Sequence, residues 1–327
     1  MALSEEQVKE RLRGVAVGLL TPFDRDLEIE HWKIEENAQF HYDEGIRTFL
    51  AAANISEYHS LSREERIDVT ETSVSALPSD ACVLAGVGGS TESARELIRA
   101  YDRVGVDAMM IMPPDHTYLH EEGLLQYYRK LASVTETPFV PYVRGFQPSV
   151  NYLAELTRLD SVVGIKYALE DPVTLGAGIN AGAEDVVWVD GLAEPYAVSF
   201  WSEGVEGFSA GVSNFRPNVG LELFDALSNG EWERARELRD LCLPYQNFRE
   251  ETGQNNTITG AISVPAVKKG LDLAGLHGGH VREPIRSLSD SDERKAEELY
   301  EQLVRDLDQF VGEPASDQHG VSAKGEN

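Results

Sequence analysis

Short apolar runs recur along the first 210 residues and are separated by longer stretches with one apolar face. Such runs are rich in β-branched residues, which is typical of parallel strands covered on both faces. They predict strands at residues 15–20, 48–53, 82–87, 108–112, 138–143, 162–166, 186–189 and 207–209.

The stretches between these runs have the period of amphipathic helices. Ser62 and Glu65 have the spacing of a capping box at the start of one of them, and Gly105 is placed to end another. The predicted helices cover residues 3–13, 30–42, 62–76, 90–104, 123–134, 150–159 and 195–201. Alternation of strands and helices over roughly 230 residues predicts an α/β fold, a (β/α)₈ TIM barrel. An open doubly wound sheet fits the strand count less well.

Beyond the last strand the pattern is wholly helical, at residues 221–227, 232–243, 261–273 and 290–311. From Gly312 onward the chain is polar and rich in small residues. We therefore expect a catalytic barrel at residues 1–235, a C-terminal helical extension at 236–311 and a disordered tail at 312–327.

The charge balance excludes several classes of partner. With 29 Lys+Arg against 56 Asp+Glu, the formal net charge is −27. Binding of nucleic acid or of an anionic membrane needs a basic face, so neither is expected. The acidic residues are spread evenly and lysine is scarce, which indicates adaptation to high salt, the alternative being an ordinary acidic cytosolic enzyme.

Two further features point to the cytoplasm. The N-terminus lacks the basic and apolar segments of a secretory signal, and no window is apolar enough to span a membrane. Cys82 and Cys242 lie far apart in apolar surroundings, so we expect two reduced core thiols.

No His, Asp and Glu cluster has metal-ligand spacing, and no metal is expected.

Lys166 ends the apolar run 162–166, where a lysine is unusual. Buried there, its amine would have a lowered pKa and become a nucleophile toward a carbonyl carbon. The alternative is a side chain that extends to solvent from the end of the strand.

In a barrel of this kind the active site lies at the C-terminal ends of the strands. Tyr142 ends the preceding strand, 24 residues before Lys166, which suits one strand–helix–strand step. A phenol there could move the protons that Schiff-base chemistry requires; otherwise Tyr142 is a core tyrosine. Arg144 is a candidate to bind a carboxylate, or it forms a loop ion pair. Ser209 ends the last strand.

Taken together, these pieces resemble the dihydrodipicolinate synthase / N-acetylneuraminate lyase superfamily of class I lyases, from about residue 13 to 303. The matching segments are Leu20-Thr21-Pro22-Phe23, Glu57 with Leu61-Ser62-Arg63-Glu64-Glu65, Gly86-Val87-Gly88, Pro113-Pro114, Tyr142, Gly164-Ile165-Lys166 and Val264-Pro265-Ala266-Val267-Lys268. The resemblance implies that Lys166 forms an imine, that Tyr142 is its acid/base partner and that no external cofactor is needed. It also implies a small 2-keto acid substrate and a homotetramer or homodimer.

The strand-two loop departs from the family pattern. Asn54, Ile55 and Ser56 lie where the family usually has Gly-Thr-Thr-Gly before the glutamate. The resemblance implies that this loop binds the substrate carboxylate through backbone N–H groups, with Asn54 or Ser56 supplying a side-chain bond. Arg144 and Ser209, from their positions at strand ends, are further candidates for substrate binding. Because Ile55 has no hydroxyl, the threonine proton relay of the synthases is in doubt.

Two segments resemble the 2-keto-3-deoxy sugar-acid dehydratase branch, namely Tyr142-Val143-Arg144 and residues 280–285. We therefore expect a dehydratase acting on a pentonate, gluconate or glucarate derivative in sugar-acid catabolism. A retro-aldolase that releases pyruvate, a 4-hydroxy-tetrahydrodipicolinate synthase and a barrel without catalytic activity remain as alternatives.

Overall fold

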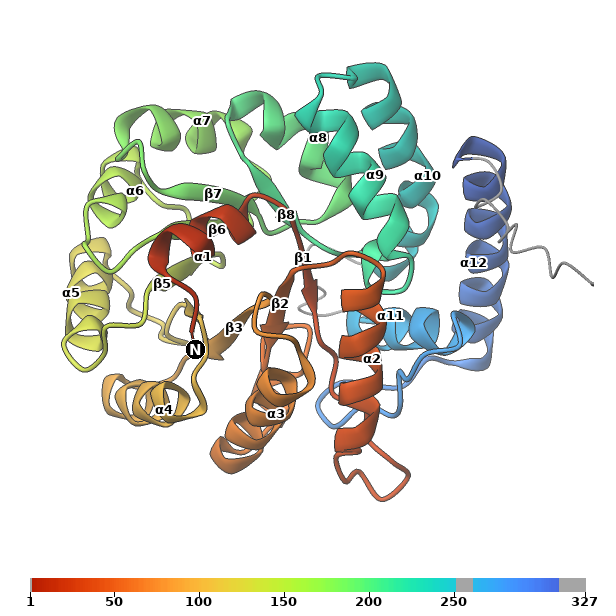
Figure 1. The fold of residues 1–327 in the computed structure, drawn as a ribbon, viewed down its shortest axis with the longest axis horizontal. Coiled ribbons are helices and arrows are strands. Elements are labelled where there is room, and N and C mark those ends of the chain that lie inside the picture. Colours follow the sequence, from red (N-terminus) through yellow and green to blue (C-terminus); the bar gives the residue numbers. More distant parts are fainter. Residues whose placement is uncertain (1, 251–260, 312–327) are drawn as a thin grey trace, which may run out of the picture.

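Eight parallel strands close into a barrel in chain order, each followed by a helix (Figure 1). The computed structural model describes residues 2–250 and 261–311. The strands are β1(Val15–Gly18), β2(Thr48–Ala51), β3(Cys82–Val87), β4(Ala108–Ile111), β5(Phe139–Val143), β6(Gly164–Tyr167), β7(Val187–Asp190) and β8(Gly207–Ser209). The predicted (β/α)₈ barrel is confirmed, with most strands one or two residues shorter or shifted. The tail expected at 312–327 lies outside the described residues.

The helices of the barrel follow the predicted ones with small changes at their ends. They are α1(Glu5–Leu12), α2(His31–Asp43), α3(Arg63–Ala76), α4(Thr91–Val104), α5(Glu121–Ala132), α6(Val150–Thr157), α7(Pro172–Ala181) and α8(Glu194–Glu203). The capping box of α3 forms as predicted, with Ser62 Oγ accepting from the amide of Glu65 and Glu65 accepting from that of Ser62. Helix α7 was not predicted from the sequence, because its small and apolar residues carry almost no amphipathic pattern.

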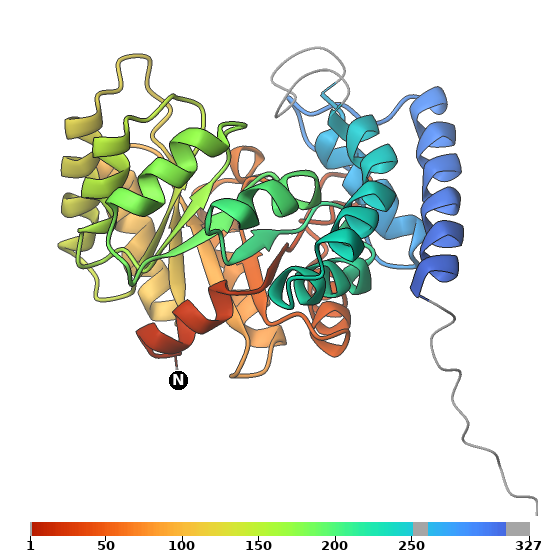
Figure 2. The same ribbon diagram turned by 90° about the horizontal axis from the view of Figure 1, so that it is seen from above.

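The C-terminal helices are α9(Pro217–Ser228), α10(Trp232–Glu250), α11(Ser263–Leu273) and α12(Asp290–Val311). They stand together on one side of the barrel, with α12 outermost (Figure 2). Gly270 of α11 lets that helix lie against Phe215, since a Cβ there would come within 2.5 Å of the ring. Phe215 also packs on Tyr245 of α10, with ring centroids 4.8 Å apart. The extension therefore shares a hydrophobic core with the β1 and β8 side of the barrel.

The prediction for α10 was wrong at its end. The sequence suggested a helix that stops at residue 243, and the next residue, Pro244, lacks a backbone donor. The helix instead continues through Pro244 to Glu250, stabilised by buried Tyr245 and Phe248 in its last turns. This extra length carries two charged side chains toward the mouth of the barrel. Within the described ranges, no helix is both long and apolar enough to cross a membrane.

Candidate active site

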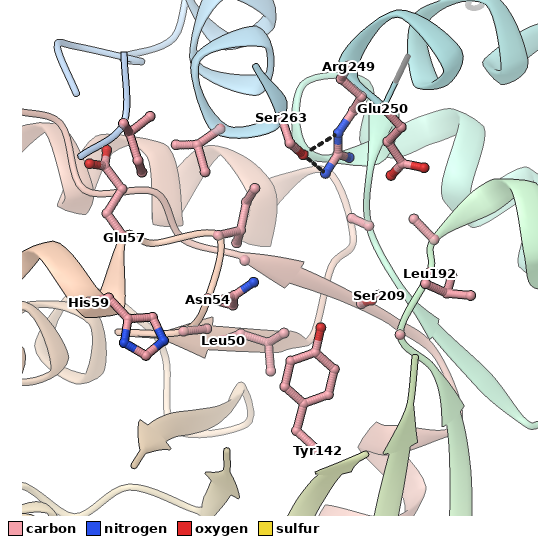
Figure 3. Close-up of a pocket in the computed structure, with 18 of the residues that line it drawn as sticks. Leu50, Asn54, Glu57, His59, Tyr142, Leu192, Ser209, Arg249, Glu250 and Ser263 are labelled. Carbon is pink, nitrogen blue, oxygen red and sulfur yellow. Dashed lines mark hydrogen bonds between the residues drawn. The ribbon is translucent and has the colours of Figure 1, made fainter. Parts of the chain in front are cut away.

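A cavity of about 400 Å³ opens at the C-terminal ends of the barrel strands. Strand ends and the loops after them form one wall, with Tyr142, Lys166 and Ser209 among their side chains. The opposite wall comes from the C-terminal extension through Arg249, Glu250 and other residues (Figure 3). The cavity is thus enclosed by two parts of the chain that lie far apart in the sequence.

Tyr142 and Lys166 meet as the sequence predicted. They are direct register partners on β5 and β6, and the Lys166 Nζ lies 4.7 Å from the centre of the Tyr142 ring. Lys166 is only 9% exposed and Tyr142 only 4%. Both side chains line the cavity, so a ligand in it can reach the amine and the phenol together.

Electrostatics favour a reactive amine at this position. Burial, reinforced by the positive charge of Arg144, lowers the pKa of Lys166 to about 8, and Asp190 opposes this shift. Much more of the amine is therefore neutral near neutral pH than for an ordinary lysine, and only the neutral amine attacks a carbonyl carbon. Burial raises the pKa of the Tyr142 phenol, with Arg144 opposing, so this phenol stays protonated and carries a proton that it can exchange with a bound substrate.

Asp190 lies at the end of β7, in register with the residue that follows Lys166, and is fully buried. One carboxyl oxygen accepts from the amide of Leu192 at 2.6 Å, and its carbonyl accepts from Ser209 Oγ at 3.1 Å. Burial raises the pKa of Asp190 well above its ordinary value. Ser209 lines the cavity and is held by this bond.

The strand-two loop divides between cavity and interior. Asn54 and Ile55 line the cavity, together with Tyr142 (Figure 3). Ser56 is buried beneath them and is not one of the described lining residues. Its carbonyl accepts from Thr21 Oγ1 at 2.8 Å. The structure therefore brings Asn54 and Ile55 to the predicted site and leaves Ser56 behind it.

Glu57 anchors this loop to the C-terminal extension. Its backbone is left-handed at φ 61°, and its carboxylate lies 2.5 Å from the buried Lys268 Nζ. Lys268 also donates to the carbonyls of Thr21, at 2.7 Å, and His280. The amide of Arg282 donates to the second carboxylate oxygen of Glu57 at 3.1 Å. A buried ion pair with these extra bonds fixes the loop that lines the cavity.

Arg144 lies at the edge of the site. Its guanidinium carbon is 5.4 Å from the centre of the Tyr142 ring, and the side chain is half-buried. It is not one of the described lining residues. The structure thus places the charge of Arg144 close enough to act on Lys166 and Tyr142, without bringing it into the cavity wall.

Sequence reasoning missed Arg249 and Glu250, because it ended their helix at residue 243. A signal was present, since the apolar spacing of Leu238, Cys242 and Tyr245 continues across Pro244.

Within residues 2–250 and 261–311, no group of three His, Cys, Asp or Glu side chains is placed to hold a metal ion.

Comparison with known proteins adds to this geometry. The model of the dihydrodipicolinate synthetase family matches residues 11–303. A Bacillus licheniformis protein named "Probable 5-dehydro-4-deoxyglucarate dehydratase" is 26% identical over 283 residues, 85% of this chain and 89% of that one. The 4-hydroxy-tetrahydrodipicolinate synthase of Archaeoglobus fulgidus is 28% identical over 297 residues, 89% of this chain and 98% of that one. The crystal structure of dihydrodipicolinate synthase from Oceanobacillus iheyensis superposes with a TM-score of 0.87 at 28% identity, covering 92% of this chain and 100% of that one.

Proposed function

Because the chain belongs to the dihydrodipicolinate synthetase family, we propose that it is a Schiff-base lyase that dehydrates a 2-keto-3-deoxy sugar acid. Enzymes of this family are lyases that act through a lysine Schiff base and use no external cofactor. The pairing of Lys166 with Tyr142 in the cavity is the observation that carries the proposal.

The reaction begins when the neutral Lys166 amine attacks C2 of the keto acid. Loss of water, assisted by protons that Tyr142 moves, gives an iminium ion. The iminium withdraws electrons, so a proton leaves C3 and an enamine forms. The enamine then expels hydroxide from C4, and a proton converts this hydroxide into water. A second water molecule hydrolyses the resulting imine and returns the lysine, so the net change is the loss of one water.

Within the family, two observations favour a dehydratase. Ile55 lines the cavity where the synthases have a hydroxyl-bearing residue, so the threonine relay of the synthases is missing at this position. The Bacillus licheniformis relative carries a dehydratase name. Its substrate name describes a six-carbon diacid which, counted from the other end, is a 2-keto-3-deoxy acid.

The substrate carboxylate beside the keto group is assigned to the loop at Asn54 and Ile55. Asn54 supplies a side-chain amide, and the loop is held by the Glu57 anchor. Ser209 supplies a hydroxyl from the end of β8. Arg144 contributes through its charge on Lys166 and Tyr142.

Product analysis tests this proposal. The protein is incubated with a panel of 2-keto-3-deoxy acids, and the products are identified by mass spectrometry. A dehydratase keeps the C3–C4 bond, so no pyruvate forms. Release of pyruvate with an aldehyde would show a retro-aldolase, and turnover only of pyruvate with aspartate semialdehyde would show a synthase.

The proposal also covers the cellular location and the oligomeric state of the enzyme. We infer a cytoplasmic enzyme, on its two free and buried cysteines, and a homodimer or homotetramer, on the family resemblance. Light scattering of the purified protein measures the oligomeric state directly.

A further inference from the structure

Arg249 is the next-to-last residue of α10, and its guanidinium lines the cavity across from Tyr142 (Figure 3). The side chain is only 8% exposed. Buried arginines are normally paired with a carboxylate, because an unpaired charge in the interior is costly.

Neutral groups hold this guanidinium in place. Nε and Nη2 both donate to Ser263 Oγ, at 3.0 and 2.8 Å, and Nη1 donates to Gln246 Oε1 at 3.0 Å. In the part of the chain that the structure describes, no carboxylate oxygen lies within 4.0 Å of a nitrogen of this guanidinium, the distance that would make an ion pair. A guanidinium has five N–H donors, so donors remain on the side that faces the cavity.

The nearest acidic group in this network is already committed. Gln246 Nε2 donates to Glu194 at 2.7 Å. The same carboxylate accepts from the amides of Gly211, at 2.9 Å, and Ser213, at 2.8 Å. Gln246 therefore holds Arg249 in position, and among the described residues the guanidinium donates only to neutral groups, although its charge also acts on the neighbouring Glu250.

We propose that Arg249 binds a second carboxylate, at the end of the substrate farthest from the keto group, and so selects 2-keto-3-deoxy diacids. This inference rests on the proposed function, in which Lys166 takes the keto carbon on the opposite wall. A guanidinium can bind a carboxylate through two parallel hydrogen bonds, which a terminal hydroxymethyl group cannot match. Lys166 is used by the imine, so among the described lining residues Arg249 is the cation left for such a group.

Glu250 sharpens the selection. It lines the same cavity, and burial raises its pKa while Arg249 opposes this shift. Its carboxylate can accept hydrogen bonds from hydroxyls along the substrate. If Arg249 is replaced by a neutral residue, Glu250 would repel a substrate carboxylate. The variant should therefore lose more activity toward the diacid than the loss of the arginine hydrogen bonds alone implies.

The test compares two six-carbon 2-keto-3-deoxy acids of the same configuration at C4 and C5, a diacid with a terminal carboxylate and a monoacid with a terminal hydroxymethyl group. We expect the wild type to prefer the diacid in kcat/KM, and Arg249→Gln to lower the value for the diacid ~10²-fold and the value for the monoacid far less. Arg249→Lys keeps the charge and should retain part of the preference. Arg234→Gln is the matched control, since Arg234 lies on the same helix but pairs with Glu222 at 2.6 Å.

Several outcomes would overturn the inference. They are an equal loss of kcat/KM for both substrates in Arg249→Gln, an unchanged preference for the diacid in that variant, or a wild type that prefers the monoacid. Borohydride trapping with each substrate distinguishes a failure of the proposed function from a failure of the role of Arg249. If the wild type forms no adduct on Lys166, the proposed function fails together with this inference, whereas adducts in wild type and variant with unchanged selectivity remove the role of Arg249 alone.

Discussion

Replacing Lys166 by methionine should abolish catalysis and make the fold more stable. The lysine is buried on the barrel side of the cavity, and burial disfavours its charged form. Its Nζ lies over the Tyr142 ring, and the charge of Asp190 offsets only part of the cost of burial. Methionine keeps the apolar stem of the side chain and removes the charge.

The size of the effect follows from the pKa of Lys166. The shift from 10.5 in the unfolded chain to about 8 in the folded protein corresponds to roughly 3 kcal/mol at about 1.4 kcal/mol per pH unit. Both states are protonated below pH 8, so the destabilisation is then complete. It disappears as the pH rises from about 8 to 10.5, where both states become neutral.

The assay is urea unfolding of wild type and Lys166→Met from pH 7 to pH 10. We expect the variant to be more stable by about 2–3 kcal/mol at pH 7, with the difference shrinking as the pH rises. Lys295→Met is the control, because Lys295 is exposed on α12 and its removal should change little. A variant that is less stable than wild type at pH 7, or a stability gain independent of pH, would refute the reasoning.

Other perturbations test the remaining parts of the site. Tyr142→Phe should lower kcat by ~10²–10⁴, the usual contribution of a positioned acid or base, and a rate near that of wild type removes Tyr142 from that role. Lys268→Met leaves the buried Glu57 carboxylate unpaired and should cost about 3–5 kcal/mol in urea unfolding, whereas Glu57→Gln combined with it should recover part of this loss. With a net charge of −27, the melting temperature should fall as salt is lowered from molar to dilute, and an unchanged value argues against adaptation to salt.

The barrel could be predicted because each strand is a local apolar run and each connection is short. The same regularity placed Tyr142 and Lys166 on neighbouring strand ends, and the structure makes them direct register partners. Helix α7 escaped prediction because its residues are small and apolar on every side, so its position is set by packing against α6 and α8.

The far wall of the cavity could not be derived in the same way. Arg249 and Glu250 reach the site only because α10 continues past Pro244, which tertiary packing of Tyr245 and Phe248 permits. Ser56 was predicted in the wall but lies beneath it. Its backbone forms part of the turn before the left-handed Glu57, and the ion pair of Glu57 with Lys268 depends on a contact between distant parts of the chain.

The central claim is that a poorly solvated amine on β6 captures the keto carbon of the substrate. Sodium borohydride added in the presence of a 2-keto-3-deoxy acid should reduce the imine to a stable secondary amine. Peptide mass spectrometry should then find the adduct on Lys166 and find none in Lys166→Met. An adduct on another lysine, or no adduct while the substrate is turned over, would contradict the account.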